Sequence, residues 1–236
     1  MIFCEWDDLP EQIRSDAVRP YYDALSKRKV SLVIKRFFDI VVALLLLVLL
    51  SPMFLILAMA IKLDSPGPVF YRQVRITSYG KEFRIHKFRS MRTGADRGSQ
   101  VTVCGDSRIT RVGHLIRKCR LDEISQLIDI LQGNMAFVGT RPEVPKYVAA
   151  YTPEMMATLL MPDGVTSLAS IMYKDEAELL DVAEDTDKVY IEQVLPGKMK
   201  YNLYDIKEFS FIREIKLMFM TIFAVLGKEY REDEVL

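Results

Sequence analysis

Two adjacent acidic residues, Asp122 and Glu123, lie in a part of the sequence that is otherwise rich in cations. The nearby cations are Arg117, Lys118, Arg120 and Arg141. Carboxylates among several cations can stay ionised, can hold a divalent metal ion and can act as a nucleophile toward a bound phosphate. Taken alone, such a pair is more often an N-cap and a charge that compensates the helix dipole. The surrounding cations favour the chemical interpretation.

The charges of the chain are unevenly distributed, although its formal net charge is zero. Residues 62–120 hold 14 Lys and Arg against 4 acids, whereas residues 121–236 hold 11 against 21. A basic stretch that directly follows an apolar segment suits an anionic membrane surface or a polyanionic ligand such as a diphosphate. A solvated basic face is the simpler alternative.

Helical patterns on both sides of the acidic pair indicate which elements position it. Residues 107–118 place apolar side chains at helical spacing between cations, which predicts an amphipathic helix with a basic side. A second helix is expected from about Asp122 to Gly133, because its apolar residues form one stripe and the glycine supplies a stop. The acidic pair would then occupy the first turn, where helix amides and the positive end of the dipole face anions.

Other segments supply the rest of the expected fold. Two runs with high strand propensity, 69–76 and 82–88, flank Tyr79-Gly80 and predict a β-hairpin. Near the C-terminus, residues 209–226 form an apolar helical pattern with a few cations, which suits a helix lying on a membrane interface. A buried terminal helix is an equally simple interpretation of that pattern.

Residues 40–61 form a stretch of 22 residues in which only Ser51 and Pro52 are not apolar. This is close to the roughly 20 residues needed to cross a bilayer. Pro52 lacks an N–H and clashes with the carbonyl four residues earlier, so the helix must bend, while Ser51 can hydrogen-bond a freed carbonyl. Cations flank both ends, which favours a cytoplasmic location for both. We expect a re-entrant helix hairpin in one leaflet; an ordinary kinked spanning helix is the alternative.

Length and composition are those of one domain with a membrane segment. We expect an α+β, mostly helical fold: a re-entrant membrane helix hairpin, a small β-hairpin and amphipathic interfacial helices around a compact cytoplasmic catalytic domain. The expected boundaries are 1–34 for an N-terminal segment without an assigned role, 35–63 for the membrane hairpin and 64–236 for the catalytic domain. Three scattered cysteines make no disulfide framework, which favours a reducing, cytosolic setting.

Six blocks of the sequence, from about residue 35 to about residue 226, resemble the bacterial sugar transferases known as monotopic phosphoglycosyl transferases. The blocks are "KRFFDI" before the apolar run with its Ser51-Pro52 break, "DSPGPVFYRQ", "KFRSMR", "RITRVGHLIRK", "LDEISQL" continuing to "LQGNMAFVGTRPE", and "FSFIREIKLMF". Six blocks in the family's order and at similar spacing do not arise by accident. The sequence is therefore identified as a member of this family.

The resemblance implies that polyprenyl (undecaprenyl) phosphate accepts a sugar 1-phosphate from a UDP-sugar, with release of UMP. Asp122 would be the nucleophile that carries a covalent sugar-phosphate intermediate, and Glu123 would position or deprotonate the lipid phosphate. A magnesium ion (Mg2+) beside Asp122 would neutralise diphosphate charge. The resemblance also implies phosphate or nucleotide contacts by Arg117, Arg141, Pro142, Lys87 and Arg89.

The same resemblance implies a cellular location and partners. The catalytic domain would lie at the cytoplasmic face of the bacterial inner membrane, where membrane lipid, UDP-sugar and polyprenyl phosphate meet. The reaction would be the first membrane step of a glycoconjugate, lipopolysaccharide or exopolysaccharide pathway, and downstream glycosyltransferases would use its product. A homo-oligomer is compatible with the sequence.

Two features depart from the family pattern, and two other classes of function stay open. Thr140 precedes Arg141 where proline is usual, and "MPDGVTSLASI" replaces a "PGITG" type of run, so nucleotide and sugar recognition are the steps concerned. The alternatives are a catalytically inactive membrane scaffold and a membrane-tethered nucleic-acid binder that uses residues 62–120. The intact acidic pair argues against the first, and the lack of a recognisable nucleic-acid motif argues against the second.

Overall fold

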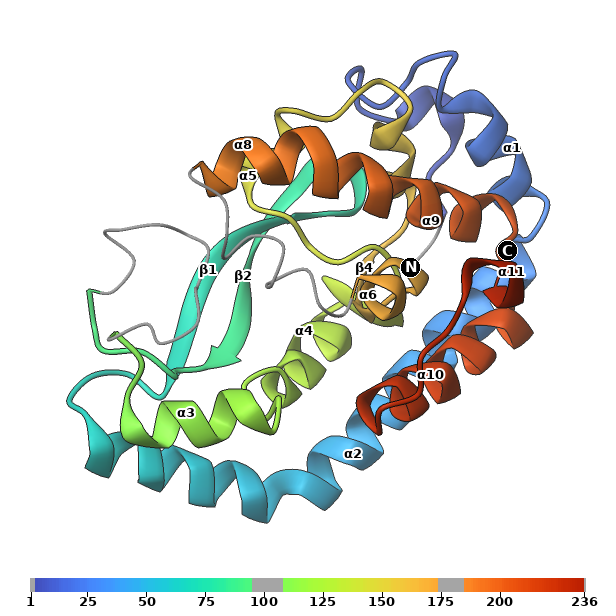
Figure 1. The fold of residues 1–236 in the computed structure, drawn as a ribbon. Helices are drawn as coiled ribbons and strands as arrows, with labels where there is room; N and C mark the ends of the chain where they lie inside the picture. Colours follow the sequence, from blue (N-terminus) through green and yellow to red (C-terminus); the bar gives the residue numbers. More distant parts are fainter. Residues whose placement is uncertain (1–2, 95–107, 174–184, 236) are drawn as a thin grey trace.

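The computed structural model describes residues 3–94, 108–173 and 185–235. The α-helices are α1 (Arg19–Ser26), α2 (Lys29–Asp64), α3 (Arg111–Lys118), α4 (Leu127–Gln132), α5 (Pro145–Val148), α6 (Leu168–Met172), α8 (Thr186–Val189), α9 (Leu195–Lys207), α10 (Phe211–Val225) and α11 (Glu232–Val235). Shorter helical turns are η1 (Trp6–Asp8), η2 (Ser78–Gly80), η4 (Ile124–Gln126), η5 (Met155–Leu160) and the π-helical η6 (Tyr190–Val194). The strands are β1 (Phe70–Thr77), β2 (Lys81–Phe88), β3 (Met135–Val138) and β4 (Asp163–Thr166). The predicted mostly helical fold with a small β-hairpin is confirmed (Figure 1).

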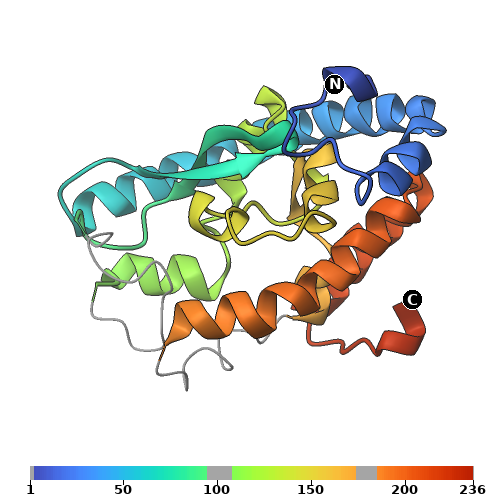
Figure 2. The same ribbon diagram turned by 90° about the horizontal axis from the view of Figure 1, so that it is seen from above.

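The predicted hairpin is formed by β1 and β2, which pair antiparallel from Phe70 opposite Phe88 to Thr77 opposite Lys81. The turn between the strands holds two successive positive φ angles, 60° at Tyr79 and 74° at Gly80. Glycine adopts left-handed backbone at little cost in free energy, whereas tyrosine seldom adopts it. The residue type therefore suits the backbone conformation better at Gly80 than at Tyr79. A second, parallel pair joins β3 to β4, and in Figure 2 the segment from α5 to β4 lies between the hairpin and α9.

Helix α2 is one continuous helix of 36 residues that bends near its middle (Figure 1). The Ser51 hydroxyl donates a 2.8 Å hydrogen bond to the carbonyl of Val48. In a regular helix this carbonyl would accept the N–H of residue 52, which proline lacks. The predicted local compensation by Ser51 is therefore confirmed. The structure shows one bent helix without an intervening turn, and a re-entrant path through a leaflet stays a prediction.

One side of α2 packs against the hairpin, α3 and α4, and its other sides are exposed. Ala43 is fully buried in a cluster with Phe83 and Ile85 of the hairpin, while Ile61 packs in a cluster with Phe88. The outward apolar side chains are exposed, among them Leu49 at 72%, Leu55 at 67% and Leu63 at 89%. Helix α2 is long and apolar enough to cross a membrane by length and composition.

The two helices expected around the acidic pair are present, but the second begins later than predicted. Helix α3 begins at Arg111, after Thr110 caps its N-terminus through a hydrogen bond from the amide of Gly113. Asp122 lies in a turn before η4, and α4 begins only at Leu127, so the pair does not occupy the first turn of an α-helix. The predicted stop at Gly133 is confirmed, because this residue ends α4 with a φ of 86°.

Helix α10 confirms the predicted C-terminal helix, and its apolar side chains are partly buried and partly exposed. Leu217 and Met220 are buried against the rest of the chain. Ile212, Phe219 and Val225 are 82%, 58% and 66% exposed. One side of the helix thus belongs to the core, and apolar side chains are exposed on the other side. A position of this helix on a membrane interface stays a prediction.

The N-terminal segment packs onto the main core. Leu9, Ile13 and Leu25 are buried in one cluster with Leu160 of η5 and Ile206 of α9. The hydroxyl of Tyr79, at the tip of the hairpin, accepts a hydrogen bond from the amide of Cys4, and other contacts join α1 to η5 and α9. The segment before α2 is therefore part of the folded domain, and it covers the end of the hairpin.

Candidate functional site

The backbone that carries Asp122 is set by the way α3 ends. The amide of Leu121 donates to the carbonyl of Ile116 over 2.8 Å, and the amide of Arg120 donates to that of Arg117 over 3.0 Å. These two bonds form a Schellman motif, in which the residue after the helix adopts left-handed backbone. That residue is Arg120, with a φ of 52°, rather than glycine. Leu121 then packs in the apolar cluster of Ile116, which fixes the chain just before Asp122.

The end of β2 fixes the same segment from the other side. The carbonyl of Asp122 accepts hydrogen bonds from the amide of Phe88 (3.0 Å) and from the hydroxyl of Ser125 (3.2 Å). Fully buried Asp129 accepts from the amide of His86 through one oxygen and lies 2.8 Å from His86 Nδ1 through the other. These contacts hold the acidic pair beside Lys87 by backbone and buried polar bonds, so its position does not depend on its own side chains.

Glu123 joins two cations that are distant in the sequence. Lys87 Nζ lies 3.0 Å from its Oε1, and the guanidinium of Arg141 donates to both carboxylate oxygens, through Nη1 over 3.3 Å and also through Nη2. Burial raises the pKa of Glu123, but Arg141 and Lys87 together outweigh it and hold this pKa well below its usual range. Glu123 is therefore ionised at neutral pH and binds both cations.

Asp122 has a different environment. Burial, and next the charge of Glu123, raise its pKa, while Lys87 and Arg117 act in the opposite direction. Among the described residues, no other side chain forms a hydrogen bond or an ion pair with this carboxylate. Its own backbone amide is the hydrogen-bond donor that acts on it. A partly desolvated carboxylate without a side-chain partner among the described residues keeps an oxygen available for a ligand or an electrophile.

The structure brings together most of the predicted site residues, but it gives Arg89 a different environment. Lys87, Asp122, Glu123 and Arg141 form one cluster, and Arg117 influences the pKa of Asp122. Arg89 is 5% exposed, and its guanidinium donates to the carbonyls of Ser65 (2.7 Å) and Pro66 (2.6 Å) after α2. This contact fixes the connection from α2 to the hairpin, and a phosphate contact by Arg89 stays a prediction.

Sequence reasoning missed two contributors to this site. Arg75 of β1 donates to the carbonyl of Pro142 over 2.8 Å, next to Arg141. The pair of His86 and Asp129 ties β2 to α4. A cation in a strand and a lone histidine carry no local signal of these roles, because their partners are far away in the sequence.

The residues present fit a magnesium ion only when substrate phosphates complete its coordination. Within residues 3–94, 108–173 and 185–235, no group of three or more His, Cys, Asp or Glu side chains could hold a metal. Magnesium is commonly held by one or two carboxylates together with phosphate oxygens and water. Asp122 can supply such a carboxylate, whereas both oxygens of Glu123 already accept hydrogen bonds from cations.

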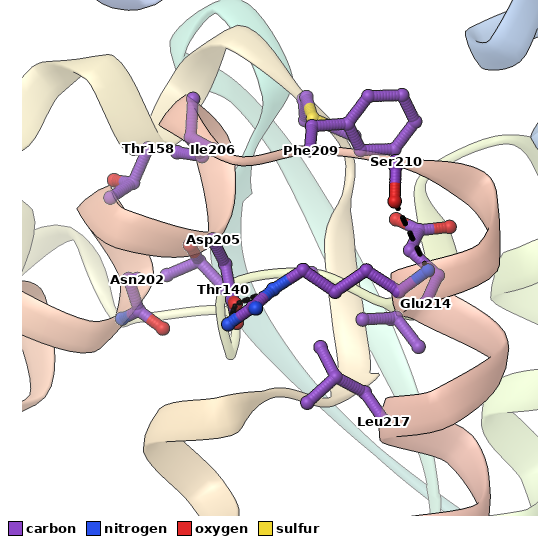
Figure 3. A pocket seen from close by; sticks show the side chains of 13 residues that line it. Thr140, Thr158, Asn202, Asp205, Ile206, Phe209, Ser210, Glu214 and Leu217 are labelled. Atoms are coloured by element: carbon purple, nitrogen blue, oxygen red, sulfur yellow. Dashed lines mark hydrogen bonds and ion pairs between the residues drawn. The ribbon is translucent and has the colours of Figure 1, made fainter. Parts of the chain in front are cut away.

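A pocket whose lining contains none of the residues of the acidic cluster is shown in Figure 3. It lies between the end of β3, α9 and α10, and Thr140 is its link to the neighbouring Arg141. Arg213 and Asp205, which both line it, pair at 3.1 Å, and the side-chain oxygen of Asn202 has no hydrogen-bond partner among the described residues. The chain thus contributes Thr140 to the pocket, while the next side chain, Arg141, contacts Glu123 of the acidic pair.

The chain is similar in sequence to proteins whose names describe sugar-phosphate transfer or exopolysaccharide production. The chain is 36% identical over 197 residues to a UDP-N-acetylgalactosamine-undecaprenyl-phosphate N-acetylgalactosaminephosphotransferase of Aeromonas hydrophila, covering 82% of this chain and 44% of the relative. It is 34% identical over 218 residues to a UDP-glucose:undecaprenyl-phosphate glucose-1-phosphate transferase of Escherichia coli (strain K12), covering 90% and 44%. It is 34% identical over 205 residues to an exopolysaccharide production protein PSS of Rhizobium leguminosarum bv. phaseoli, covering 84% and 97%.

The chain spans about half the length of the first two of these relatives. The profile of a family described as bacterial sugar transferase matches residues 30–228, which include the hairpin, the acidic cluster, α10 and all of α2 except its first residue. The chain belongs to the bacterial sugar transferase family.

Proposed function

We propose that this chain transfers a sugar 1-phosphate from a UDP-sugar to undecaprenyl phosphate and releases UMP. The observation that carries the proposal is the cluster of Asp122, Glu123, Lys87 and Arg141, in a chain whose relatives are named for this reaction. A carboxylate beside cations, with no side-chain hydrogen bond among the described residues, is what a displacement at a phosphorus atom needs, because the cations attract the diphosphate and the carboxylate supplies the nucleophile.

The reaction would proceed by two displacements at one phosphorus atom. A carboxylate oxygen of Asp122 attacks the β-phosphorus of the UDP-sugar, the bond from that phosphorus to the bridging oxygen breaks, and UMP leaves with the electron pair. An oxygen of the lipid phosphate then attacks the same phosphorus, and the bond to Asp122 breaks, which regenerates the carboxylate. Partial burial favours the first attack, because it weakens hydration of the Asp122 carboxylate.

Lys87 and Arg141 would bind the phosphates. Both cations are held by Glu123 in the structure, and Arg141 has enough donors to keep this contact while another N–H contacts a phosphate oxygen. Because the pKa of Glu123 is held well below its usual range, this residue is a poor proton acceptor at neutral pH. Of the two roles expected for Glu123, its environment supports positioning more than deprotonation of the lipid phosphate.

A magnesium ion would be held by Asp122 and by the diphosphate of the donor. When bound, it would neutralise charge on the phosphate oxygens. Asp122 and the two cations then orient the β-phosphorus for attack.

The apolar exposed faces of α2 and α10 would place this site at the membrane surface. The two helices are locked together, because buried Lys35 of α2 donates to Glu214 of α10 over 2.7 Å and to the carbonyl of Val138 over 3.0 Å. We propose that α2 enters and leaves the cytoplasmic leaflet of the inner membrane and that α10 lies on its surface. The lipid phosphate and the soluble donor would then meet at Asp122, in the first membrane step of a glycoconjugate or exopolysaccharide pathway with downstream glycosyltransferases.

The test is turnover by the purified chain in lipid nanodiscs with undecaprenyl phosphate and magnesium. UDP-glucose, UDP-galactose, UDP-N-acetylglucosamine and UDP-N-acetylgalactosamine are supplied one at a time, and both UMP release and the mass of the lipid product are measured. We expect one or more donors to give a lipid diphosphate sugar, and Asp122→Asn to give none. Lack of product from every donor with the unaltered chain would refute the proposal.

A further inference from the structure

The guanidinium of Arg75 joins the hairpin to residues 141–143, which carry Arg141 and belong to the connection from β3 to α5. These three residues are called the turn at residues 141–143. Its Nη1 donates to the carbonyl of Pro142 over 2.8 Å, and its Nη2 donates to the side-chain oxygen of Gln73 over 2.7 Å. The next residue of β1, Ile76, donates its amide to the carbonyl of Glu143 over 3.0 Å. Strand β1 therefore holds two successive carbonyls of the segment that directly follows Arg141.

The same segment is held from its other side by the helix after residue 185. The hydroxyl of Tyr190, the first residue of the π-helical η6, donates to the carboxylate of Glu143. Lys198 of α9 lies 3.4 Å from that hydroxyl. Glu143, Tyr190 and Lys198 are all buried. The turn at residues 141–143 is thus preformed, with one attachment from β1 and another from η6 and α9.

We propose that Arg75 is a positioning residue for the proposed transfer reaction, because it fixes the turn from which Arg141 reaches Glu123 and the donor diphosphate. The inference rests on the proposed function, since it assigns the held turn to binding of the UDP-sugar. Arg75 acts through its hydrogen bond to the carbonyl of Pro142. This bond restrains the backbone next to Arg141 and therefore the position of the Arg141 side chain. If the turn samples other conformations, the apparent affinity for the donor falls by the fraction of time that the turn is formed.

The surroundings of Arg75 indicate why an arginine is needed at this position. Its charge faces Glu143 on the turn, while Arg141 and Lys87 are close enough to act against it. A guanidinium can donate to Pro142 and Gln73 at once from fixed directions, whereas a lysine ammonium lacks this planar fork. Lysine is therefore expected to restore the charge but only part of the positioning.

A purely structural role would be a contribution to the stability of the hairpin alone, and Arg72 provides the matched control. It lies on the same strand and is exposed, and its Nε and Nη2 both donate to the carbonyl of Arg84, over 3.1 and 2.8 Å. Arg72→Gln thus removes an arginine–carbonyl contact from the hairpin without touching the turn at residues 141–143.

The experiment compares Arg75→Gln, Arg75→Lys and Arg72→Gln in nanodiscs by steady-state kinetics, by calorimetric binding of the UDP-sugar and by amide hydrogen exchange. For Arg75→Gln we expect a KM and a dissociation constant for the UDP-sugar raised about tenfold, which corresponds to a turn formed roughly a tenth of the time. The value of kcat should change less than about threefold, and the KM for undecaprenyl phosphate should not change. Arg75→Lys should fall between Arg75→Gln and the unaltered chain, and Arg72→Gln should match the unaltered chain.

Two further measurements separate positioning from other causes. In the background of Arg141→Ala, Arg75→Gln should have no additional effect on donor binding, because the side chain that it positions is gone. The amides of Arg141 and Glu143 should exchange faster in Arg75→Gln than in Arg72→Gln. Unchanged donor affinity and unchanged exchange in a folded Arg75→Gln would overturn the inference, as would an equal loss in Arg72→Gln. If the unaltered chain bound no UDP-sugar, the proposed function would fail, while the exchange measurement would still test the positioning of the turn.

Discussion

Replacement of Asp122 by asparagine should remove activity and yet leave the fold as stable as before, or more stable. Burial, the larger cause, and Glu123 raise the pKa of Asp122 above its ordinary value, so its ionised form is less favourable in the folded protein than in the unfolded chain. A group with a raised pKa contributes stability at low pH and loses it as the pH rises through the folded pKa. At neutral pH the asparagine variant avoids that cost. The carbonyl of Asp122, which bonds Phe88 and Ser125, is unchanged by the substitution.

Glu123→Gln should have the opposite effect on stability. The Glu123 side chain is 16% exposed, and its negative charge compensates the positive charges of Lys87 and Arg141, whose side chains are 22% and 33% exposed. Removing one partner of a fully buried ion pair costs about 3–5 kcal/mol. Because these two cations can regain water, we expect about 1–3 kcal/mol instead. For a chain of this size, roughly 2–4 °C per kcal/mol gives a melting temperature about 2–12 °C lower.

The assay is thermal unfolding in nanodiscs at neutral pH, with UMP release and mass spectrometry of the intact protein after mixing with the UDP-sugar. Asp122→Asn should keep or raise the melting temperature and form no covalent intermediate. Glu123→Gln should melt earlier, turn over slowly and still form the intermediate. Exposed Glu82 on the same strand as Lys87 provides a control, Glu82→Gln, which should change none of these. Equal loss of stability in both site variants would refute the reasoning about their environments, and wild-type-like UMP release by Asp122→Asn would refute its assignment as nucleophile.

Other predictions follow from the acidic cluster, from helices α2 and α10, and from the Schellman motif at Arg120. Arg141→Ala should raise the KM for the UDP-sugar by about tenfold or more, since a charge-assisted contact to phosphate is lost, and chelator should stop UMP release; full activity in excess chelator would contradict the magnesium proposal. A cysteine replacing Val30 should resist an impermeant reagent in intact cells and become reactive when Pro52→Ala allows α2 to cross the bilayer; labelling with Pro52 intact would refute the re-entrant path. Arg120→Gly should stabilise the fold by about 1 kcal/mol, read as a higher melting temperature, because a φ of 52° disfavours a residue with a Cβ atom. Burial raises the pKa of Glu214 from 4.5 to about 7 despite Lys35, so stability should decline as the pH rises from about 4.5 through about 7, and Glu214→Gln should flatten this decline in a series of melting temperatures.

The sequence by itself determined the elements whose signals are local. The β-hairpin follows from two runs of high strand propensity on either side of Tyr79-Gly80, and the end of α4 follows from a glycine that adopts left-handed backbone at little cost. The bond from Ser51 to Val48 follows from the missing N–H of Pro52, because the freed carbonyl lies within the same helical turn. In each case, the cause and its consequence lie within a few residues, where covalent geometry alone limits the outcome.

Only the tertiary structure decided what each cation of the basic stretch contacts. Lys87 meets Glu123 across 36 residues of sequence, and Arg141 meets it across 18. Arg89, two residues after Lys87, instead fixes the end of α2, and Arg75 holds the turn after Arg141 across 67 residues. Charge and spacing do not distinguish these roles, since long flexible side chains pair according to which elements pack together. Packing on α2 and the Schellman turn after α3 set that arrangement. They also set the contrast between Glu123, which is bound by two cations, and Asp122, whose carboxylate has no side-chain hydrogen bond among the described residues.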